Sequence, residues 1–255
     1  MTGGAVLFAR YAYPPNALGY CGPGDPAALL GYANAGVADG GLVALARQFA
    51  GAWPYLALIA AANGRADPLD PAVVEAYWIG NRLLHRVPPG LFAAHLRDRF
   101  EERAGRGFPD LAELAVVGGV PHHNFHVFAV YPWVGLLRAG RADEPMRVLD
   151  SCRVRWATVL TLHSGLAEVM SQPLTWDGRR LSLGTPEVRL VTVATAGDTL
   201  APRVRVGDTV SVHWDWICDV LSPLRVARLR HYTLSQLRLV NDALRRPVAA
   251  AVLDS

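Results

Sequence analysis

Three histidines stand close together in the segment Pro121-His122-His123-Asn124-Phe125-His126. Neutral imidazole is the most common metal ligand in proteins. In a helix His122 and His126 would share one face, and in an extended segment they would alternate onto the same face. Apolar residues flank the segment on both sides, which argues against a freely exposed loop. We therefore expect at least two of His122, His123 and His126 to point into an enclosed metal or ligand site. A polar loop with surface histidines is the structural alternative.

Cys152 and His213 form a second candidate pair. Thiolate is a soft ligand that suits iron, zinc or cuprous copper. We expect the neighbouring Arg153 and Arg155 to lower the pKa of the Cys152 thiol and so favour the thiolate. His213 stands at the end of a predicted strand. The structural alternatives are a buried cysteine that packs as a small apolar residue and a hydrogen-bonded core histidine.

Cys21 lies in the segment 11–25, which is rich in tyrosine, proline and glycine and is predicted as a loop ahead of a helix. Asp25 is the expected N-cap of that helix, and the helix N-terminus would favour a thiolate at Cys21. Cys21 is therefore a further candidate metal ligand, aimed by the loop into a cleft. The alternative is an ordinary loop that packs through its tyrosines. Cys218 is expected to pack in the core.

The elements that position these residues are helical in the first part of the chain. Asp25-Pro26 and Asp70-Pro71 are paired N-cap and first-turn signals, and Ser222-Pro223 begins a closing helix in the same way. A further helix follows Pro89. The most apolar stretch, residues 42–62, is interrupted by charged, polar and proline residues, so it predicts a pair of buried helices and not a membrane span.

The pattern changes near residue 145, where strand-like segments replace the helices. These segments cover residues 153–162, 166–172, 181–183, 188–194 and 209–214, and turn residues separate them. Five short strands at this spacing predict a small OB-like β-barrel. The predicted fold class is α+β, with a helical domain over residues 1–145 and a five-stranded barrel plus C-terminal helix over residues 146–255. The ends of the first and last barrel strands can meet, so we expect Cys152 and His213 to lie together and to face the helical domain.

The barrel region carries a recognisable series of motifs. Asp150-Ser151-Cys152-Arg153-Val154 opens it, Thr158-Val159-Leu160 follows, and Val206-Gly207-Asp208-Thr209-Val210-Ser211-Val212-His213 precedes the closing helix. This region resembles the HypC-type chaperones of nickel–iron hydrogenase maturation. The resemblance implies that Cys152, helped by His213, holds an iron centre that carries cyanide and carbon monoxide. It further implies that this centre passes toward the hydrogenase large subunit or another maturation protein.

Composition narrows the function classes. The formal net charge is only +3, which argues against a nucleic-acid binder. All 25 basic residues are arginine, so lysine Schiff bases, a pyridoxal phosphate anchor and a phosphate-loop lysine are excluded. The first residues lack the pattern of a signal peptide. The chain is therefore expected in the cytoplasm, with no membrane partner. Its three cysteines are an odd number, and in that location we expect reduced thiols.

Three hypotheses follow from these patterns. The first is an accessory protein for a metalloenzyme, with Cys152 and His213 as ligands and with help from the histidines at 122, 123 and 126. Its metal would be iron, with zinc as the alternative. The second is a metal-dependent enzyme that acts on a small molecule through the histidine cluster and Cys21. The third is an interaction protein without a metal.

Overall fold

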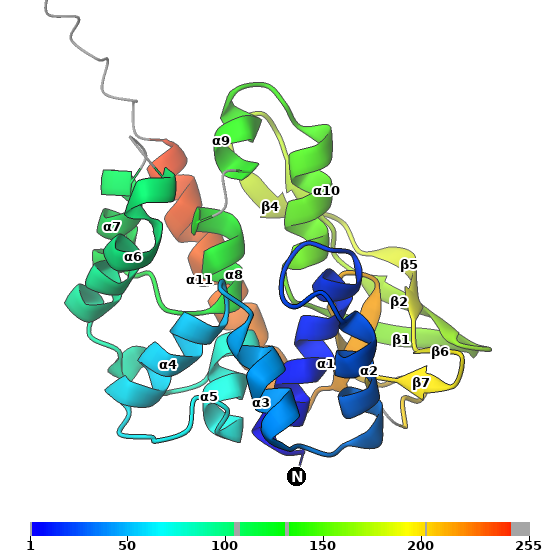
Figure 1. Ribbon diagram of the computed structural model, residues 1–255. Coiled ribbons are helices and arrows are strands. Elements are labelled where there is room, and N and C mark those ends of the chain that lie inside the picture. The colour runs from blue at the N-terminus through cyan, green and yellow to red at the C-terminus, as the bar shows by residue number, and fades with distance from the viewer. Residues whose placement is uncertain (1, 105–107, 131–132, 202, 246–255) are drawn as a thin grey trace, which may run out of the picture.

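The computed structural model describes residues 2–104, 108–130, 133–201 and 203–245 of the chain (Figure 1). Helices make up its first part: α1 (Gly4–Ala17), α2 (Pro26–Ala35), α3 (Gly40–Arg47), α4 (Trp53–Ala62), α5 (Pro71–Trp78), η1 (Leu84–Arg86), α6 (Pro89–Ala104) and α7 (Phe108–Val116). Short elements lead from there to the strands: α8 (His123–Phe125), the π turn η3 (His126–Val130), α9 (Trp133–Arg138) and α10 (Asp143–Cys152).

The helix starts predicted at Asp25, Asp70 and Ser222 are confirmed, because each of these side chains accepts a hydrogen bond from a first-turn N–H.

A mixed five-stranded sheet curls into a barrel in the second part. Its strands are β1 (Arg155–His163), β2 (Leu166–Ser171), β5 (Glu187–Thr192), β8 (Thr209–His213) and β9 (Trp216–Val220), in the order β1-β2-β5-β9-β8, with β8 pairing back to β1. The seam between β5 and β9 is minimal, since it consists of one parallel residue pair, Thr192 with Trp216. Two small hairpins, β3 (Leu174–Trp176) with β4 (Leu181–Leu183) and β6 (Ala194–Thr195) with β7 (Asp198–Thr199), lie outside the barrel. The last helix of the described residues is α11 (Pro223–Leu244). The α+β fold class is confirmed.

One of the predicted strand assignments is wrong, and the predicted barrel region begins with a helix. The segment 181–183 is β4, which pairs with β3 and takes no part in the barrel, whereas β9 supplies the fifth barrel strand. Cys152 is the last residue of α10, and β1 begins three residues later, at Arg155. Val148, Leu149 and Cys152 are buried at helical spacing, and packing of this face extends the helix through the first residues of the region assigned to the barrel.

The N-terminal helix also differs from the prediction. A loop is predicted from Tyr11 onward, but α1 continues to Ala17 with Pro14 and Pro15 inside it. Nearly the whole of α1 is buried, and burial of its apolar side chains outweighs the helix hydrogen bonds that the two prolines remove. It packs against α2, α3 and α5 and also touches β8 and β9.

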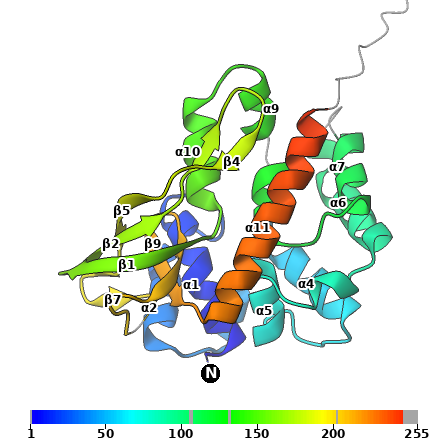
Figure 2. The same ribbon diagram turned by 180° about the vertical axis from the view of Figure 1, so that it is seen from behind.

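The largest buried cluster spans the helical and barrel parts, and the barrel interior forms a separate cluster. The largest buried cluster contains residues of α1, α4, α5 and α6 together with Val154, Cys218 and Leu229. Seen from behind, α11 lies between the helices α4 to α7 and the barrel (Figure 2), and it contacts α7, α8, β1 and β4. The predicted domain boundary at residues 145 and 146 falls inside α10. Among the helices of the described residues, none is both long and apolar enough to cross a membrane.

Candidate metal centre

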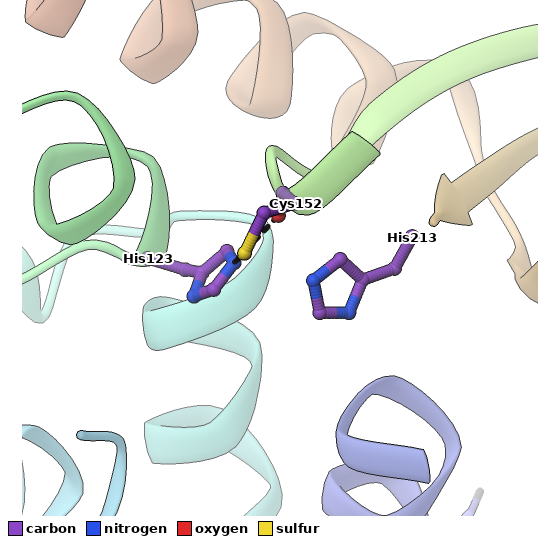
Figure 3. Close-up of side chains that lie close together, drawn as sticks. All are labelled: His123, Cys152 and His213. Atoms are coloured by element: carbon purple, nitrogen blue, oxygen red, sulfur yellow. Dashed lines mark hydrogen bonds between the residues drawn. The ribbon is translucent and has the colours of Figure 1, made fainter. Parts of the chain in front are cut away.

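Three buried side chains from distant parts of the chain meet at one point (Figure 3). His123 begins α8, Cys152 ends α10 and His213 ends β8. One nitrogen of each histidine and the Cys152 sulfur all lie within 4.8 Å of one another. The three residues are 5%, 7% and 0% exposed, respectively. The expectation that Cys152 and His213 lie together is confirmed, and His123 joins them from the helical part.

His213 is oriented as a metal ligand would be. Its Nδ1 lies 2.6 Å from the backbone oxygen of Tyr11 in α1. A carbonyl oxygen only accepts, so Nδ1 carries the proton and Nε2 keeps its lone pair. Nε2 is buried and has no hydrogen-bond partner among the described residues. Burial, together with the neighbouring His123, holds the pKa of His213 well below its usual value, so the ring is neutral. Metal-binding histidines commonly donate their other ring N–H to a carbonyl in this way.

His123 faces Cys152 with its Nε2. That nitrogen lies 2.8 Å from the Cys152 backbone oxygen and 3.9 Å from its Sγ, and Nδ1 lies 3.3 Å from the Tyr77 hydroxyl. Burial lowers the pKa of His123 to about 4, so this ring is also neutral. Because the Cys152 carbonyl oxygen only accepts, Nε2 carries the proton in the metal-free fold. Metal binding through Nε2 requires that this hydrogen bond breaks and that the proton is on Nδ1 instead, where the Tyr77 oxygen can accept it. The hydroxyl supports either tautomer because it both donates and accepts.

The arginines beside Cys152 do not activate its thiol, contrary to the prediction. Arg153 turns to the Asp150 carboxylate, and Arg155 donates to the backbone oxygens of Asp150 and Trp214. Burial, with a smaller contribution from Cys21, raises the pKa of Cys152 above its usual value. The thiol therefore keeps its proton until a metal displaces it.

A cavity of about 170 Å³ adjoins the three residues. Its wall includes the sequence candidates Cys21 and His126, so the expectation that two of the three clustered histidines share an enclosed site is confirmed by His123 and His126. Aromatic side chains line much of the remainder: Tyr20, Phe49, Tyr77, Trp78, Trp133 and Trp214. Cys21 is not activated by the following helix. Burial raises the pKa of its thiol to about 12, and the predicted thiolate there is wrong.

His122 points away from the cavity. It precedes α8 in an extended conformation, and its Nδ1 accepts the backbone N–H of Asn124 at 3.0 Å. Its ring stacks on Tyr232 of α11 with a centroid distance of 5.4 Å. The predicted convergence of His122 and His126 is therefore wrong, because the role of His122 as a helix cap takes its ring to the other side of the segment. His126 instead contacts the Tyr55 hydroxyl of α4 through Nδ1, at 3.1 Å.

Asn124 positions the site without entering it. Its Oδ1 accepts the Val154 N–H at 3.0 Å, and its Nδ2 donates to the Val154 oxygen and to the Thr233 hydroxyl, at 3.2 and 2.8 Å. These bonds tie α8 to the chain just after Cys152 and to α11. Sequence reasoning missed this role, and also that of the Tyr11 carbonyl. The only available signal was an amide side chain inside an apolar, histidine-rich segment.

Comparison with known proteins places the chain in a family. No curated protein and no solved structure matches it significantly. One family model matches residues 1–247, so the match spans the helical part, the barrel and the closing helix together. The model is described as that of a family of unknown function. The chain therefore belongs to the family DUF6390.

Proposed function

We propose that the protein is an accessory protein for metalloenzyme assembly that holds an iron ion through His123, Cys152 and His213. The observation that carries this proposal is the meeting of one sulfur and two ring nitrogens in the dry interior. Thiolate and imidazole together form a soft donor set that suits iron and also zinc. Zinc is therefore the alternative metal.

The distances between the donor atoms fit a metal of this kind. Bonds of about 2.0–2.3 Å to nitrogen and sulfur place the donors of a four-coordinate site about 3.5 Å apart. The Cys152 Sγ and the His123 Nε2 are 3.9 Å apart, and all three donor atoms lie within 4.8 Å. Small side-chain adjustments would bring them to bonding distance. The Tyr11 carbonyl already holds the His213 ring with its Nε2 lone pair available.

The client is proposed from the resemblance of the barrel region to the HypC-type chaperones. In this proposal the iron carries cyanide and carbon monoxide, and it passes to the large subunit of a nickel–iron hydrogenase or to another maturation protein. The protein would work in the cytoplasm, where its three free thiols stay reduced.

Metal analysis of anaerobically purified protein tests the proposal. We expect one metal ion per chain in the parent and a loss of at least tenfold in affinity in His123→Gln, Cys152→Ser and His213→Gln. Cys218→Ala and His163→Gln are matched controls, since Cys218 is buried away from the cavity and His163 is exposed. Controls and parent should bind alike. Equal binding by the three ligand variants, at unchanged circular dichroism, would refute the site.

Infrared spectroscopy tests the client. Bands from cyanide or carbon monoxide on bound iron, together with lower hydrogenase activity in cells that carry Cys152→Ser, are expected. Bound metal without such bands, and with unchanged hydrogenase activity, contradicts the hydrogenase role and leaves the metal site standing.

A second function has one observation in its favour. The cavity beside the three donors is large enough for a small molecule and also presents Cys21 and His126. A metal-dependent enzyme would use these groups around its substrate, without His122. Turnover that is lost in Cys21→Ala or His126→Gln, with metal content retained, would support this second function.

A further inference from the structure

Three protein ligands leave a bound metal with a further position to fill, and the cavity wall offers a second thiol for it. We propose that Cys21 is the fourth ligand of the loaded site, so that the metal is held by Cys21, His123, Cys152 and His213. This inference rests on the metal site of the proposed function. It adds a ligand from the loop between α1 and α2, residues 18–25, which we call the Cys21 loop.

The Cys21 loop forms a partly exposed part of the cavity wall. Cys21 is partly exposed, whereas most of the other residues that line the cavity are buried. The ring of Tyr20 lies against the ring of Trp214, with centroids 4.3 Å apart. The Tyr20 hydroxyl accepts a hydrogen bond from Arg147 at 2.8 Å. These contacts hold the loop over the site.

The backbone of the loop is adapted to a tight turn over the cavity. Asn16 donates hydrogen bonds from Nδ2 to the backbone oxygens of Cys21 and Pro23, at 2.8 and 2.7 Å. Gly19 and Gly22, on either side of Cys21, have φ angles of 75° and 89°. A side chain at Gly22 would meet the Phe49 ring at 2.4 Å, so the loop lies close to the aromatic wall of the cavity.

The buried donors opposite the loop require a partner. The Nε2 of His213 is buried and has no hydrogen-bond partner among the described residues, although its ring lines the cavity. Cys21 and Cys152 line the same cavity as His213. Two thiolates repel in a dry cavity, and a cation between them removes that repulsion.

Charge balance favours the second thiolate. A divalent ion bound by two neutral imidazoles and one thiolate has a net charge of +1. An uncompensated charge in the protein interior is costly. A second thiolate makes the centre neutral. Each thiol that binds releases one proton to solvent, so two protons leave as one divalent ion enters, and no oxidant or reductant is needed.

Cobalt titration of the full-length protein under nitrogen tests this ligand, because thiolate-to-cobalt charge-transfer absorbance grows with the number of bound thiolates. We expect the parent to show the absorbance of two thiolates per cobalt, and Cys21→Ser about half of it, with at least tenfold weaker binding. Cys218→Ala, the matched control for a thiol outside the cavity, should be unchanged. Alkylation by iodoacetamide, read by mass spectrometry, gives a second measurement, in which cobalt should protect Cys21.

The possible failures are distinguishable. If the parent binds cobalt with one thiolate, and Cys21→Ser leaves that absorbance and the affinity unchanged, the fourth-ligand proposal is overturned and the three-residue site stands. The fourth-ligand proposal is also overturned if His126→Gln, and not Cys21→Ser, weakens binding. If the parent binds no cobalt, the inference and the proposed metal site fail together.

Discussion

The Asn124→Ala substitution tests whether the hydrogen bonds around the site also set its affinity for a metal. The Asn124 side chain is completely buried and bonds the N–H and the oxygen of Val154 and the hydroxyl of Thr233. His123 is its chain neighbour, and Cys152 lies two residues before Val154. Alanine removes the connection that fixes α8 against the end of α10.

The magnitude follows from the number of bonds. A buried hydrogen bond contributes about 1 kcal/mol net, and a partner left unsatisfied adds to the loss, so three bonds predict a decrease of about 3–4 kcal/mol in the free energy of unfolding. Groups that orient metal ligands from outside the coordination sphere commonly change affinity by about 10–100-fold. We therefore expect at least a tenfold weaker cobalt affinity in the folded variant.

Asn241→Ala is the matched control. Asn241 is also a buried asparagine, and it bonds the N–H and the oxygen of one backbone residue, Leu181, each at 2.8 Å. It should lose about 2 kcal/mol by the same reasoning and keep the parent affinity. Urea unfolding measures the free energy of unfolding. Cobalt titration, at urea concentrations low enough to keep both variants folded, measures the affinity. A cobalt affinity of Asn124→Ala within twofold of that of Asn241→Ala would refute the positioning role.

Two further predictions concern stability. Burial lowers the pKa of both His122 and His126 to about 3, so they stay neutral in the fold while the unfolded chain takes up protons below pH 6.5. The free energy of unfolding of metal-free protein should be highest above pH 6.5 and fall by about 1.4 kcal/mol per pH unit for each such histidine as the pH drops from there toward 3. Urea melts at pH 7.5 and pH 5 that give equal values would contradict this. The second prediction concerns Gly80→Ala. Gly80 has a φ of 96°, and a Cβ added there would clash with the ring of Tyr232. We expect the substitution to lower the free energy of unfolding by at least about 2 kcal/mol. The control Gly64→Ala has a φ of 64° and open space around the new carbon, so it should show only the smaller effect of backbone strain. Thermal melts of both variants and the parent measure the two losses of stability.

Local signals in the sequence were sufficient for several elements of the fold. The helix starts after Asp25, Asp70 and Ser222 depend on side-chain caps within three residues, so they can be predicted without knowledge of the tertiary structure. The extension of α1 through Pro14 and Pro15 depends instead on burial against distant elements. The barrel role of β9 depends on pairing with β8, which a window of sequence does not reveal.

The residues of the candidate site also fall into those that the sequence alone predicts and those that depend on the folded structure. Residue chemistry pointed to Cys152, His213 and the histidine segment, because thiolates and imidazoles are the side chains that soft metal ions prefer. It did not distinguish His123 from His122, since their side chains are separated by local backbone conformation. His122 caps a short helix, and His123 turns inward toward Cys152. The predicted effect of Arg153 failed for a related reason, because the folded protein offers that arginine a buried carboxylate.

The geometry of the site also implies that the barrel is incomplete as a metal-binding unit. The barrel region contributes His213, yet the carbonyl that orients this ring belongs to Tyr11 of α1, and the second imidazole belongs to α8. Cys152 belongs to the helix that joins the two parts. A metal that binds all of these residues binds the folded arrangement and not the unfolded chain. At a free concentration of 100 times Kd it would therefore stabilise the fold by about 2.7 kcal/mol. Because the ligands come from both sides of α10, this stabilisation acts on the contact between the helical part and the barrel, and release of the metal would weaken that contact first.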